Sequence, residues 1–426
     1  MSEYIFPGYY NLNSAFLLSD GSDEPIDILK LIPRFHITES LDSDSIRGTA
    51  TFIDSIGLLD DLPLRGEETL ILNITDALKN ATLYELVIYK VSDVMVKDTN
   101  DSYMYTIHFT SKQRFEAGKH RIIESHERST SEIAQYLFSK YYKGSKNLIA
   151  EETSGTFRCV IPNYTPMQAM HFLSQRSYSS KRPSCSFRFF ESADGFYFVS
   201  DEYLIEYFIE NPDEIKEFTY DESLKKSADT LIQQMQNIIG FQNSERLNTV
   251  NDLYSGAYTN NVIEIDLMRK TITDNRYNYL ESKDRYITME GRNTTGEDKH
   301  TSSFSNRYFN EENERKFLLY KDYSSVGDIP GQIRGEQYLK DITNNRIPYR
   351  HHLNNTVVYI TTNGRLDLKA GDVISLRIPE FTSNKRKDIH PRLSGKYLIN
   401  DCTHSFKEDV YTTEMKLLKY DWGIGE

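Results

Sequence analysis

Two segments of equal length, one near each end of the chain, repeat the same order of residue types. Residues 62–74 read LPLRGEETLILNI, and residues 366–378 read LDLKAGDVISLRI. In each, leucines precede a basic residue, a turn, an acidic residue and an apolar stretch with the alternation of a strand. The identical positions are Leu62, Leu64, Leu72 and Ile74 in the first segment and Leu366, Leu368, Leu376 and Ile378 in the second.

The segments around this repeat also correspond. The matched stretches are 83–94 with 395–406, 103–111 with 410–420, and 47–54 with 260–267. Short alternating strands separated by turn residues are typical of small β-sandwiches and barrels. The sequence therefore predicts an internal duplication, with one copy of a small β domain near each end of the chain.

An acidic but otherwise ordinary composition limits the function classes. Lys and Arg number 50 against 63 Asp and Glu, a formal net charge of −13 over 426 residues. Because affinity for phosphates requires clustered cations, we do not expect the chain to grip nucleic acid. It has no apolar run of about 18 residues and no signal-like start, so we expect neither membrane insertion nor secretion. Its three widely spaced cysteines predict no disulfide framework and no cysteine zinc site, and suit a reducing cytoplasm.

The middle of the chain, residues 114–214, mixes helical and strand signals. STSE at 129–132 and TPMQ at 165–168 are capping boxes, and each precedes an apolar stripe with helical spacing. The Asp-Gly pair at 194–195 separates two aromatic stretches, which predicts a β-hairpin. This part of the chain is therefore predicted to be α+β.

The following segments carry weaker signals. Residues 231–240 have one apolar face and finish at Gly240, which predicts a helix with a glycine C-cap. The polar, Asn-rich segment 290–315 predicts a long exposed loop. Residues 335–343 predict a short helix, and the strand pattern returns over 356–420.

Cys402 and His404 are the first candidates for a metal or catalytic pair. Side chains two residues apart in a strand point to the same face, so these two could share a ligand. Structural zinc takes four closely placed ligands, and no second pair with metal spacing lies nearby in the sequence. We therefore expect a half-buried strand cysteine and an ordinary strand histidine.

Other candidate residues give no firmer site. The histidines at 351–352 lie in a segment read as extended, where neighbours face opposite ways and cannot easily share one ion. The paired carboxylates at 60–61 and 67–68 suggest glycoside hydrolysis, but they lie in turns, and only Glu68 has an acidic counterpart in the repeat, Asp372. Hydrolase, metalloprotease and P-loop motifs are missing from the sequence. We therefore expect no catalytic, cofactor-binding or metal-binding residues.

Several stretches, taken in order, resemble the baseplate hub protein of contractile-tailed bacteriophages. They are FPGYYNL at 6–12, RGTATFID at 47–54, LRGEETLILNI at 64–74, IPNYTPMQAMHFLSQRS at 161–177, SADGFYFVSD at 192–201, YSGAYTNNVIEIDL at 254–267 and SGKYLINDCTHSFKEDVYTTEMKLLKYD at 394–421. The resemblance runs along nearly the whole chain, and its force lies in the order of the stretches. The segment 290–315 has no counterpart in the family pattern.

The resemblance implies an α+β, mainly β, fold with two tube-type antiparallel β-barrel domains and an outer α+β region. It implies a homotrimer, whose two barrels per subunit form a pseudo-six-fold ring between the six-fold tail tube and the three-fold cell-puncturing spike. DNA would pass through the lumen without specific binding, and the hub itself would have no enzymatic activity. The implied partners are the trimeric spike protein, the tail tube or tube-initiator protein, baseplate wedge proteins and the tape measure protein. The implied location is the tail baseplate of the virion, assembled in the host cytoplasm.

On this basis we expect five regions. They are the first barrel at 1–113, the outer α+β domain at 114–214, a helix and the first strands of the second barrel at 215–275, an inserted loop and helix region packing with the outer domain at 276–349, and the remainder of the second barrel at 350–426.

The residues themselves support this interpretation at two points. An internal duplication is what a trimer needs in order to match a hexamer. Three copies would carry about −39 in total (3 × −13), and negative lumen walls would repel phosphates. Two alternatives stay open: a cell-wall glycan hydrolase with a carboxylate pair, and a carbohydrate-binding module that uses surfaces rich in its 30 Tyr residues.

Overall fold

The structure is a computed structural model that describes most of the chain. The described residues are 6–19, 24–55, 57–61, 64–97, 102–220, 230–245, 254, 256, 259–267, 269–278, 287–288, 291–292, 315–320, 335–354, 356–380, 389–390 and 393–419.

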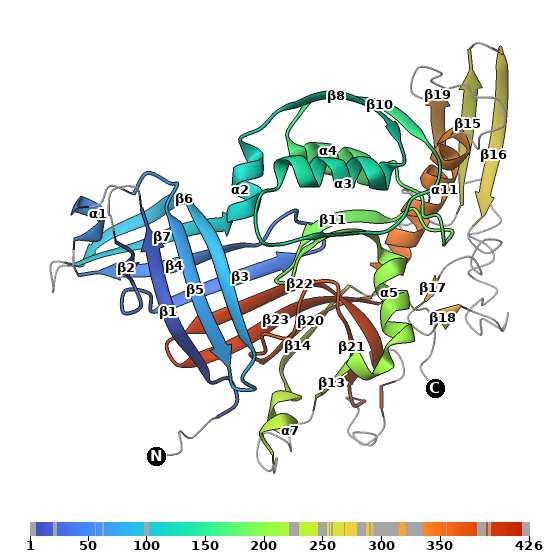
Figure 1. The fold of residues 1–426 in the computed structure, drawn as a ribbon. Coiled ribbons are helices and arrows are strands. Elements are labelled where there is room, and N and C mark those ends of the chain that lie inside the picture. Colours follow the sequence, from blue (N-terminus) through green and yellow to red (C-terminus); the bar gives the residue numbers. More distant parts are fainter. Residues whose placement is uncertain are drawn as a thin grey trace.

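One large sheet of 13 strands joins the two ends of the chain (Figure 1). Its N-terminal strands are β1 (Tyr10–Leu18), β2 (Ile26–Asp27), β3 (Arg34–Ser40), β4 (Arg47–Asp54), β5 (Thr69–Asp76), β6 (Ala81–Lys97) and β7 (Ser102–Ser111). Its later strands are β13 (Lys216–Thr219), β14 (Ile238–Glu245), β20 (Thr356–Asn363), β21 (Val373–Arg377), β22 (Gly395–Lys407) and β23 (Val410–Lys419). The strand order is β14-β20-β23-β22-β3-β4-β7-β6-β5-β1-β2, with β21 beside β22 and β13 beside β21.

Each half of this sheet has an apolar core of its own. Alternate residues of its strands point inward, which is the period of a half-buried strand. The inward residues of the repeat are Leu70, Leu72 and Ile74 in the first core and Ile374, Leu376 and Ile378 in the second, and all are buried. The two copies predicted from the sequence are therefore confirmed as two β units, which we call the first unit and the second unit.

The strand order of the two units is the same. The first unit runs β3-β4-β7-β6-β5-β1, and the second runs β14-β20-β23-β22-β21-β13. One pair of strands differs in direction between the units: β1 is antiparallel to β5, whereas β13 is parallel to β21. In the second unit a bridge between Thr219 and Asn237 brings the end of β13 next to the start of β14, which curls the sheet toward closure.

A β-bulge recurs at the same place in both units. The register shifts directly after Ile88 in β6 and directly after Ile399 in β22. The Ile88 N–H donates to the Glu68 carbonyl at 3.0 Å, and the Ile399 N–H donates to the Asp372 carbonyl at 2.8 Å. Ile88 thus corresponds to Ile399, one residue away from the match that the sequence suggested. Bulges bend and twist a strand, so their repetition gives both units the same curvature.

One predicted correspondence is wrong. The counterpart of β4 is β20, because β4 pairs with β7 as β20 pairs with β23. The stretch 260–267, matched to β4 from its alternation, instead contributes β15 (Thr259–Asp266), which lies between β16 (Thr271–Asn278) and β19 (Arg315–Tyr320) in a separate sheet. Alternating apolar and polar residues predict a strand, but they do not determine which other strands it pairs with.

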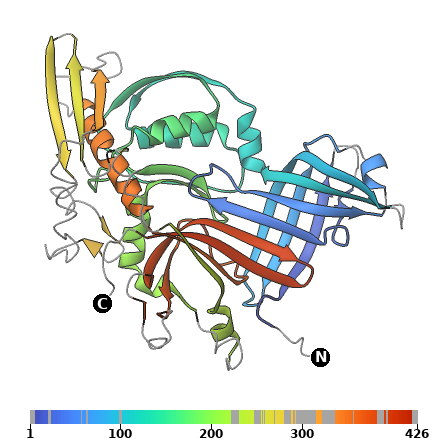
Figure 2. The same cartoon turned by 180° about the vertical axis from the view of Figure 1, so that it is seen from behind.

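The two units are joined by the long strand β22. Its first residues pair with β21, and residues 401–407 pair with β3 of the first unit. Phe406 stacks on Phe35 across this junction with ring centroids 4.5 Å apart, and the hydroxyls of Thr38 and Thr403 lie 3.0 Å apart. Figure 2 shows β3 and β22 side by side from behind.

The outer region has a third core of its own, and it packs against the second unit through a further cluster in which Phe190 and Leu204 meet Leu398. It contains α2 (Lys112–Gly118), β8 (Ile122–Arg128), α3 (Thr130–Tyr141), β9 (Leu148–Ala150), β10 (Phe157–Tyr164), α4 (Pro166–Ser174), β11 (Phe187–Glu191), β12 (Phe196–Ser200), α5 (Asp201–Glu210) and η1 (Pro212–Glu214). Both predicted capping boxes are present, at Ser129 of α3 and Thr165 of α4. The predicted hairpin is β11–β12.

Two predicted helices have different bounds in the structure. The helix expected over 231–240 stops early as α7 (Leu231–Met235), and Gly240 lies in β14, where pairing with β20 outweighs the local helical pattern. The helix expected over 335–343 continues as α11 (Gly335–Leu353) through an internal Pro348. Arg350 of α11 donates to the Ser186 hydroxyl at 3.0 Å, so this helix packs on the outer region.

The remaining described elements are short. They are α1 (Leu58–Asp61), β17 (Ile287–Thr288) and β18 (Gly291–Arg292). The exposed loop predicted over 290–315 lies almost entirely outside the described residues.

Candidate functional site

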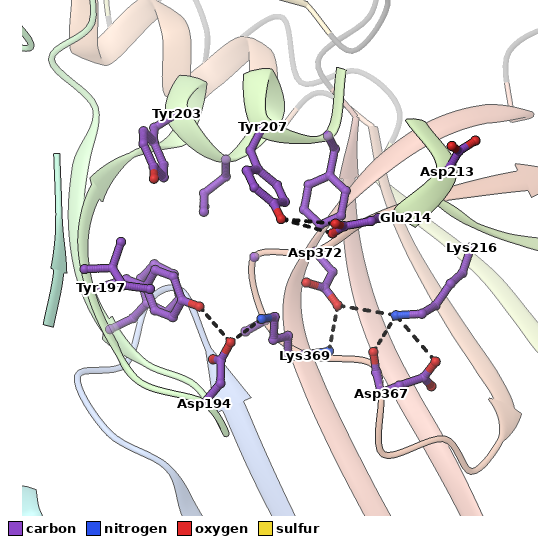
Figure 3. Close-up of a pocket in the computed structure, with 16 residues that line it drawn as sticks. Asp194, Tyr197, Tyr203, Tyr207, Asp213, Glu214, Lys216, Asp367, Lys369 and Asp372 are labelled. Atoms are coloured by element: carbon purple, nitrogen blue, oxygen red, sulfur yellow. Dashed lines mark hydrogen bonds and ion pairs between the residues drawn. The ribbon is translucent and has the colours of Figure 1, made fainter. Parts of the chain in front are cut away.

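A pocket of about 540 Å³ opens where the outer region meets the second unit (Figure 3). Helix α5 supplies Tyr203 and Tyr207, and the β11–β12 hairpin supplies Asp194 and Tyr197. The opposite wall is the turn before β21, residues 367–372, with Lys216 of β13 beside it. The pocket therefore exists only because segments far apart in the sequence converge.

The charged groups of the pocket are paired with each other. Asp194 forms an ion pair with Lys369 and accepts the hydroxyl of Tyr197 at 3.0 Å. Lys216 Nζ lies 3.6 Å from a carboxylate oxygen of Asp367. Burial opposes ionisation of Asp194, but the contact with Lys369 outweighs it and lowers the pKa of that carboxyl. The Asp194–Lys369 pair ties the outer region to the second unit, whereas Lys216 and Asp367 both belong to the second unit.

The pKa values of two neighbouring carboxyls of the pocket are shifted in opposite directions. Burial raises the pKa of Asp372 to about 6, whereas for Asp367 burial is outweighed by the hydrogen bond from Arg365, and its pKa is lowered. Such a divergence is what an acid and a base of a hydrolase require. Asp372 has a structural counterpart, however, because Glu68 occupies the same position in the first unit.

Glu68 shows what this position does where no pocket is involved. Its carboxylate accepts the backbone N–H groups of Arg65 at 2.6 Å and Gly66 at 3.0 Å, which closes the turn before β5. Asp372 likewise accepts the N–H of Lys369 at 3.3 Å before β21. The duplicated acidic residue is therefore a turn-closing group in both units, and Glu68 is buried in the turn where the sequence placed it.

Cys402 and His404 do lie on one face of β22. Cys402 Sγ is 3.7 Å from His404 Nε2, and His404 Nδ1 is 2.7 Å from the hydroxyl of Tyr411. Both side chains are fully buried, not half-buried, since they face the core where the two units join. Burial lowers the pKa of His404 to about 4 and raises that of the Cys402 thiol well above its usual range. A neutral imidazole and a protonated thiol in an apolar interior are packing groups.

The other candidate residues are scattered. His351 and His352 lie in α11, not in an extended segment, and Asp60 and Asp61 lie in α1. Within the described ranges, no group of three or more His, Cys, Asp or Glu side chains is placed to hold a metal ion. Of the helices that the structure describes, none has the length and apolar character needed to cross a membrane.

Glu39 is a buried carboxyl near the pocket that was not among the candidate residues taken from the sequence. It lies on the core side of β3, fully buried, and its Oε2 accepts the hydroxyl of Ser192 at 2.9 Å and the N–H of Ala370 at 3.3 Å. One carboxyl thus contacts the first unit, the outer region and the second unit. The sequence does indicate that Glu39 is buried, because in the strand RFHITES alternate residues share a face, and Glu39 is on the same face as the apolar Phe35 and Ile37.

The opposite face of the joined sheet is polar. Its hydroxyl-bearing residues on β3, β4, β22 and β23 are Thr38, Ser40, Thr49, Thr51, Thr403, Ser405 and Thr412, and we call this surface the hydroxyl face. Its charged residues are Arg34, Arg47, Asp401, Lys407, Glu414 and Lys416. Beyond Lys416 the same side of the sheet is covered, because Leu418 of β23 packs with Phe190 and Leu204 of the outer region. The hydroxyl face is the part of this side that precedes that cover.

Two solved structures share this architecture along nearly their whole length. A tail protein from Neisseria meningitidis aligns over 98% of this chain and 98% of its own, with a TM-score of 0.56 and 10% identity. The 43 kDa tail protein of prophage MuSo2 from Shewanella oneidensis aligns over 97% of this chain and 100% of its own, with a TM-score of 0.52 and 8% identity. The chain has the fold of these tail proteins.

The tail-protein fold confirms the resemblance expected from the sequence, and the α+β, mainly β, class with it. Comparison of the sequence with protein-family models and with curated proteins finds no match. The likeness is therefore carried by the arrangement of the strands.

Proposed function

We propose that the protein is the structural hub of a phage tail baseplate. Three copies form a ring in which six β units alternate, first unit and second unit, around a central passage. The ring joins a six-fold tail tube on one side to a three-fold spike on the other, and DNA passes through it without specific binding. The chain has no catalytic role in this proposal.

The repeated strand order carries the proposal. One chain holds two units with the same order of six strands and the same bulge, fused into one sheet through β22 and β3. Three such chains present six near-equivalent units, which resolves the mismatch between a six-fold and a three-fold partner. The tail-protein fold supports the same setting, and wedge and tape measure proteins are the further partners we propose.

We propose that the hydroxyl face lines the passage. The two apolar cores occupy the other side of the sheet, and on this side the outer region covers only the end beyond Lys416, so the hydroxyl face is free to turn inward in a ring. On β3, β4, β22 and β23 it carries four cations and two anions, and Lys416 lies 3.9 Å from Asp401. A hydroxyl-rich wall with few clustered cations offers DNA little to bind. We therefore propose a hydroxyl-rich lumen wall instead of the acidic wall expected from the net charge of the chain.

Light scattering on the purified chain tests the assembly. A trimer has a mass of three times 49.6 kDa, about 149 kDa, and this is the expected result. A monomer at every concentration measured, with or without a trimeric spike, contradicts the hub.

A cell-wall turnover assay tests the absence of catalysis. We expect no glycan hydrolysis by the purified protein, because Asp372 closes a turn as Glu68 does. Turnover that disappears in Asp372→Asn but persists in Glu68→Gln would instead identify a hydrolase.

A further inference from the structure

Several strand edges of the large sheet have no partner among the described strands, and two of them belong to β6 and β14. Strand β5 pairs with β6 only as far as Val87, so residues 90–97 of β6 pair with β7 on one side alone. Strand β14 ends the sheet, with β20 as its neighbour. An uncovered edge is a template for pairing with another chain.

The uncovered part of β6 is also its most apolar exposed part. Within residues 90–97 the exposed fractions of the side chains are 50% for Val94, 56% for Met95 and 66% for Val96. Large apolar side chains gathered at one open strand edge mark an interaction surface, because a soluble protein otherwise avoids them.

The chain itself contains the contact that would cover such an edge. After its bulge, β22 pairs antiparallel with β3, the first strand of the other unit. By the repeated strand order, β22 corresponds to β6 and β3 corresponds to β14. Both members of the corresponding pair, β6 after its bulge and β14, are the open edges just described.

We propose that residues 90–97 of β6 in one copy pair antiparallel with β14 of the next copy. This rests on the proposed function, because it names the surface by which the hub would form its ring. The contact repeats the β22–β3 junction between chains, so each unit meets its neighbours in the same way. Three such head-to-tail contacts close the ring and leave neither edge open.

The internal junction also gives the register. Met95 faces Met104 in the first unit as Ser405 faces Thr412 in the second, so Met95 takes the place of Ser405. The register of β6 shifts a second time between Ser92 and Met95, where β6 has one residue more than β22 does. Asp93 lies at this shift with a φ of 55°.

The matching position on β14 follows in the same way. Gln242 faces Tyr359 as His36 faces Thr49, so Gln242 takes the place of His36. Since Ser405 pairs with His36 inside the chain, Met95 should lie opposite Gln242 of the next copy. The next position inside the chain, where Phe406 stacks on Phe35, is taken between copies by Val96 and Phe241.

Disulfide trapping tests this register. In Met95→Cys/Gln242→Cys the two new cysteines would face each other between copies, and directly opposite residues of an antiparallel pair lie close enough to bridge. The native Cys159, Cys185 and Cys402 are buried and do not compete. Mild oxidation should give covalent dimers and trimers on a denaturing gel.

A matched double variant is the control. Glu85→Cys/Gln242→Cys places the first cysteine on the same strand, but in the part already paired with β5, where Glu85 faces Ile71. It should stay monomeric on the denaturing gel. Equal cross-linking of both variants, or none in the first one, overturns the proposed register.

Charge substitution provides an independent readout. Val96→Asp should weaken trimer formation at least tenfold, measured by light scattering across a dilution series. Leu83→Asp is its control, since Leu83 is similarly exposed, at 59%, in the paired part of the same strand. Equal weakening by both substitutions counts against the β6–β14 contact. A trimer that forms but fails these tests refutes the strand pairing alone, whereas a chain that never trimerises refutes the hub.

Discussion

Replacing Glu39 with glutamine should stabilise the protein more at pH 8 than at pH 4. The Glu39 carboxyl is fully buried where the first unit, the second unit and the outer region meet. Burial raises its pKa to about 7, and the nearby ammonium of Lys146 and the hydrogen bonds from Ser192 and Ala370 only partly offset that effect. Its Oε1 has no hydrogen-bond partner in the described part of the chain.

The size of the effect follows from the two pKa values. Below pH 4.5 the carboxyl is protonated in both the folded and the unfolded state and adds no pH dependence. Between 4.5 and about 7 the unfolded state ionises while the folded state holds its proton, so the free energy of unfolding falls as pH rises. At about 1.4 kcal/mol for each pKa unit, the loss is on the order of 3 kcal/mol by pH 8.

Glutamine resembles the protonated carboxyl at every pH and should not show this loss. Urea unfolding of the wild type and of Glu39→Gln at pH 4 and pH 8 measures this loss of stability. The stability difference, variant minus wild type, should grow by about 3 kcal/mol between the two pH values. A Glu85→Gln control, at an exposed position on β6, should show a difference near zero at both.

The comparison with a variant is necessary because the wild-type profile mixes opposing effects. His404, with its lowered pKa, makes the protein more stable as pH rises over a similar window. This contribution is common to wild type and Glu39→Gln and cancels in their difference. A difference that does not change with pH would refute the buried, shifted carboxyl. A difference that falls toward pH 8 would show that the Glu39 charge stabilises the junction.

Three further substitutions have definite expected outcomes. Gly48→Ala would drive a Cβ into the carbonyl of His36 on β3 and should cost at least about 2 kcal/mol in urea unfolding, whereas Gly118→Ala has open space and should change little. Ser129→Ala removes the N-cap of α3 and should cost about 1 kcal/mol by the same measurement, with no change in oligomeric mass. His404→Gln should make the stability difference, variant minus wild type, grow by about 3 kcal/mol as pH falls from 6.5 toward 4, because only the unfolded histidine of the wild type protonates in that window; a difference that does not change with pH would contradict the buried neutral state of His404.

Local signals in the sequence predicted local structure well. Each capping box requires only residues three apart, and both Ser129 and Thr165 cap helices as expected. The repeat was visible because Leu72 and Leu376 must face equivalent cores. These features depend on neighbours along the chain or on a copied pattern.

Features set by distant partners were not predictable in the same way. The choice of β20 over the stretch 260–267 as the counterpart of β4 is made by pairing with β23, whose residues lie 49 to 63 positions further along the chain than their partners. Gly240 follows a helical pattern but is held in β14 by β20. The pocket around Asp194 and Lys369 joins residues 175 apart in sequence, and no short motif encodes such a meeting.

Electron microscopy of the purified assembly tests the central claim most directly. We expect a ring of three chains with six near-equivalent lobes around one open passage, first and second units alternating at the same radius, and the hydroxyl face turned inward. A particle in which the two units of a chain lie at different radii, or in which only one of them borders the passage, would contradict it.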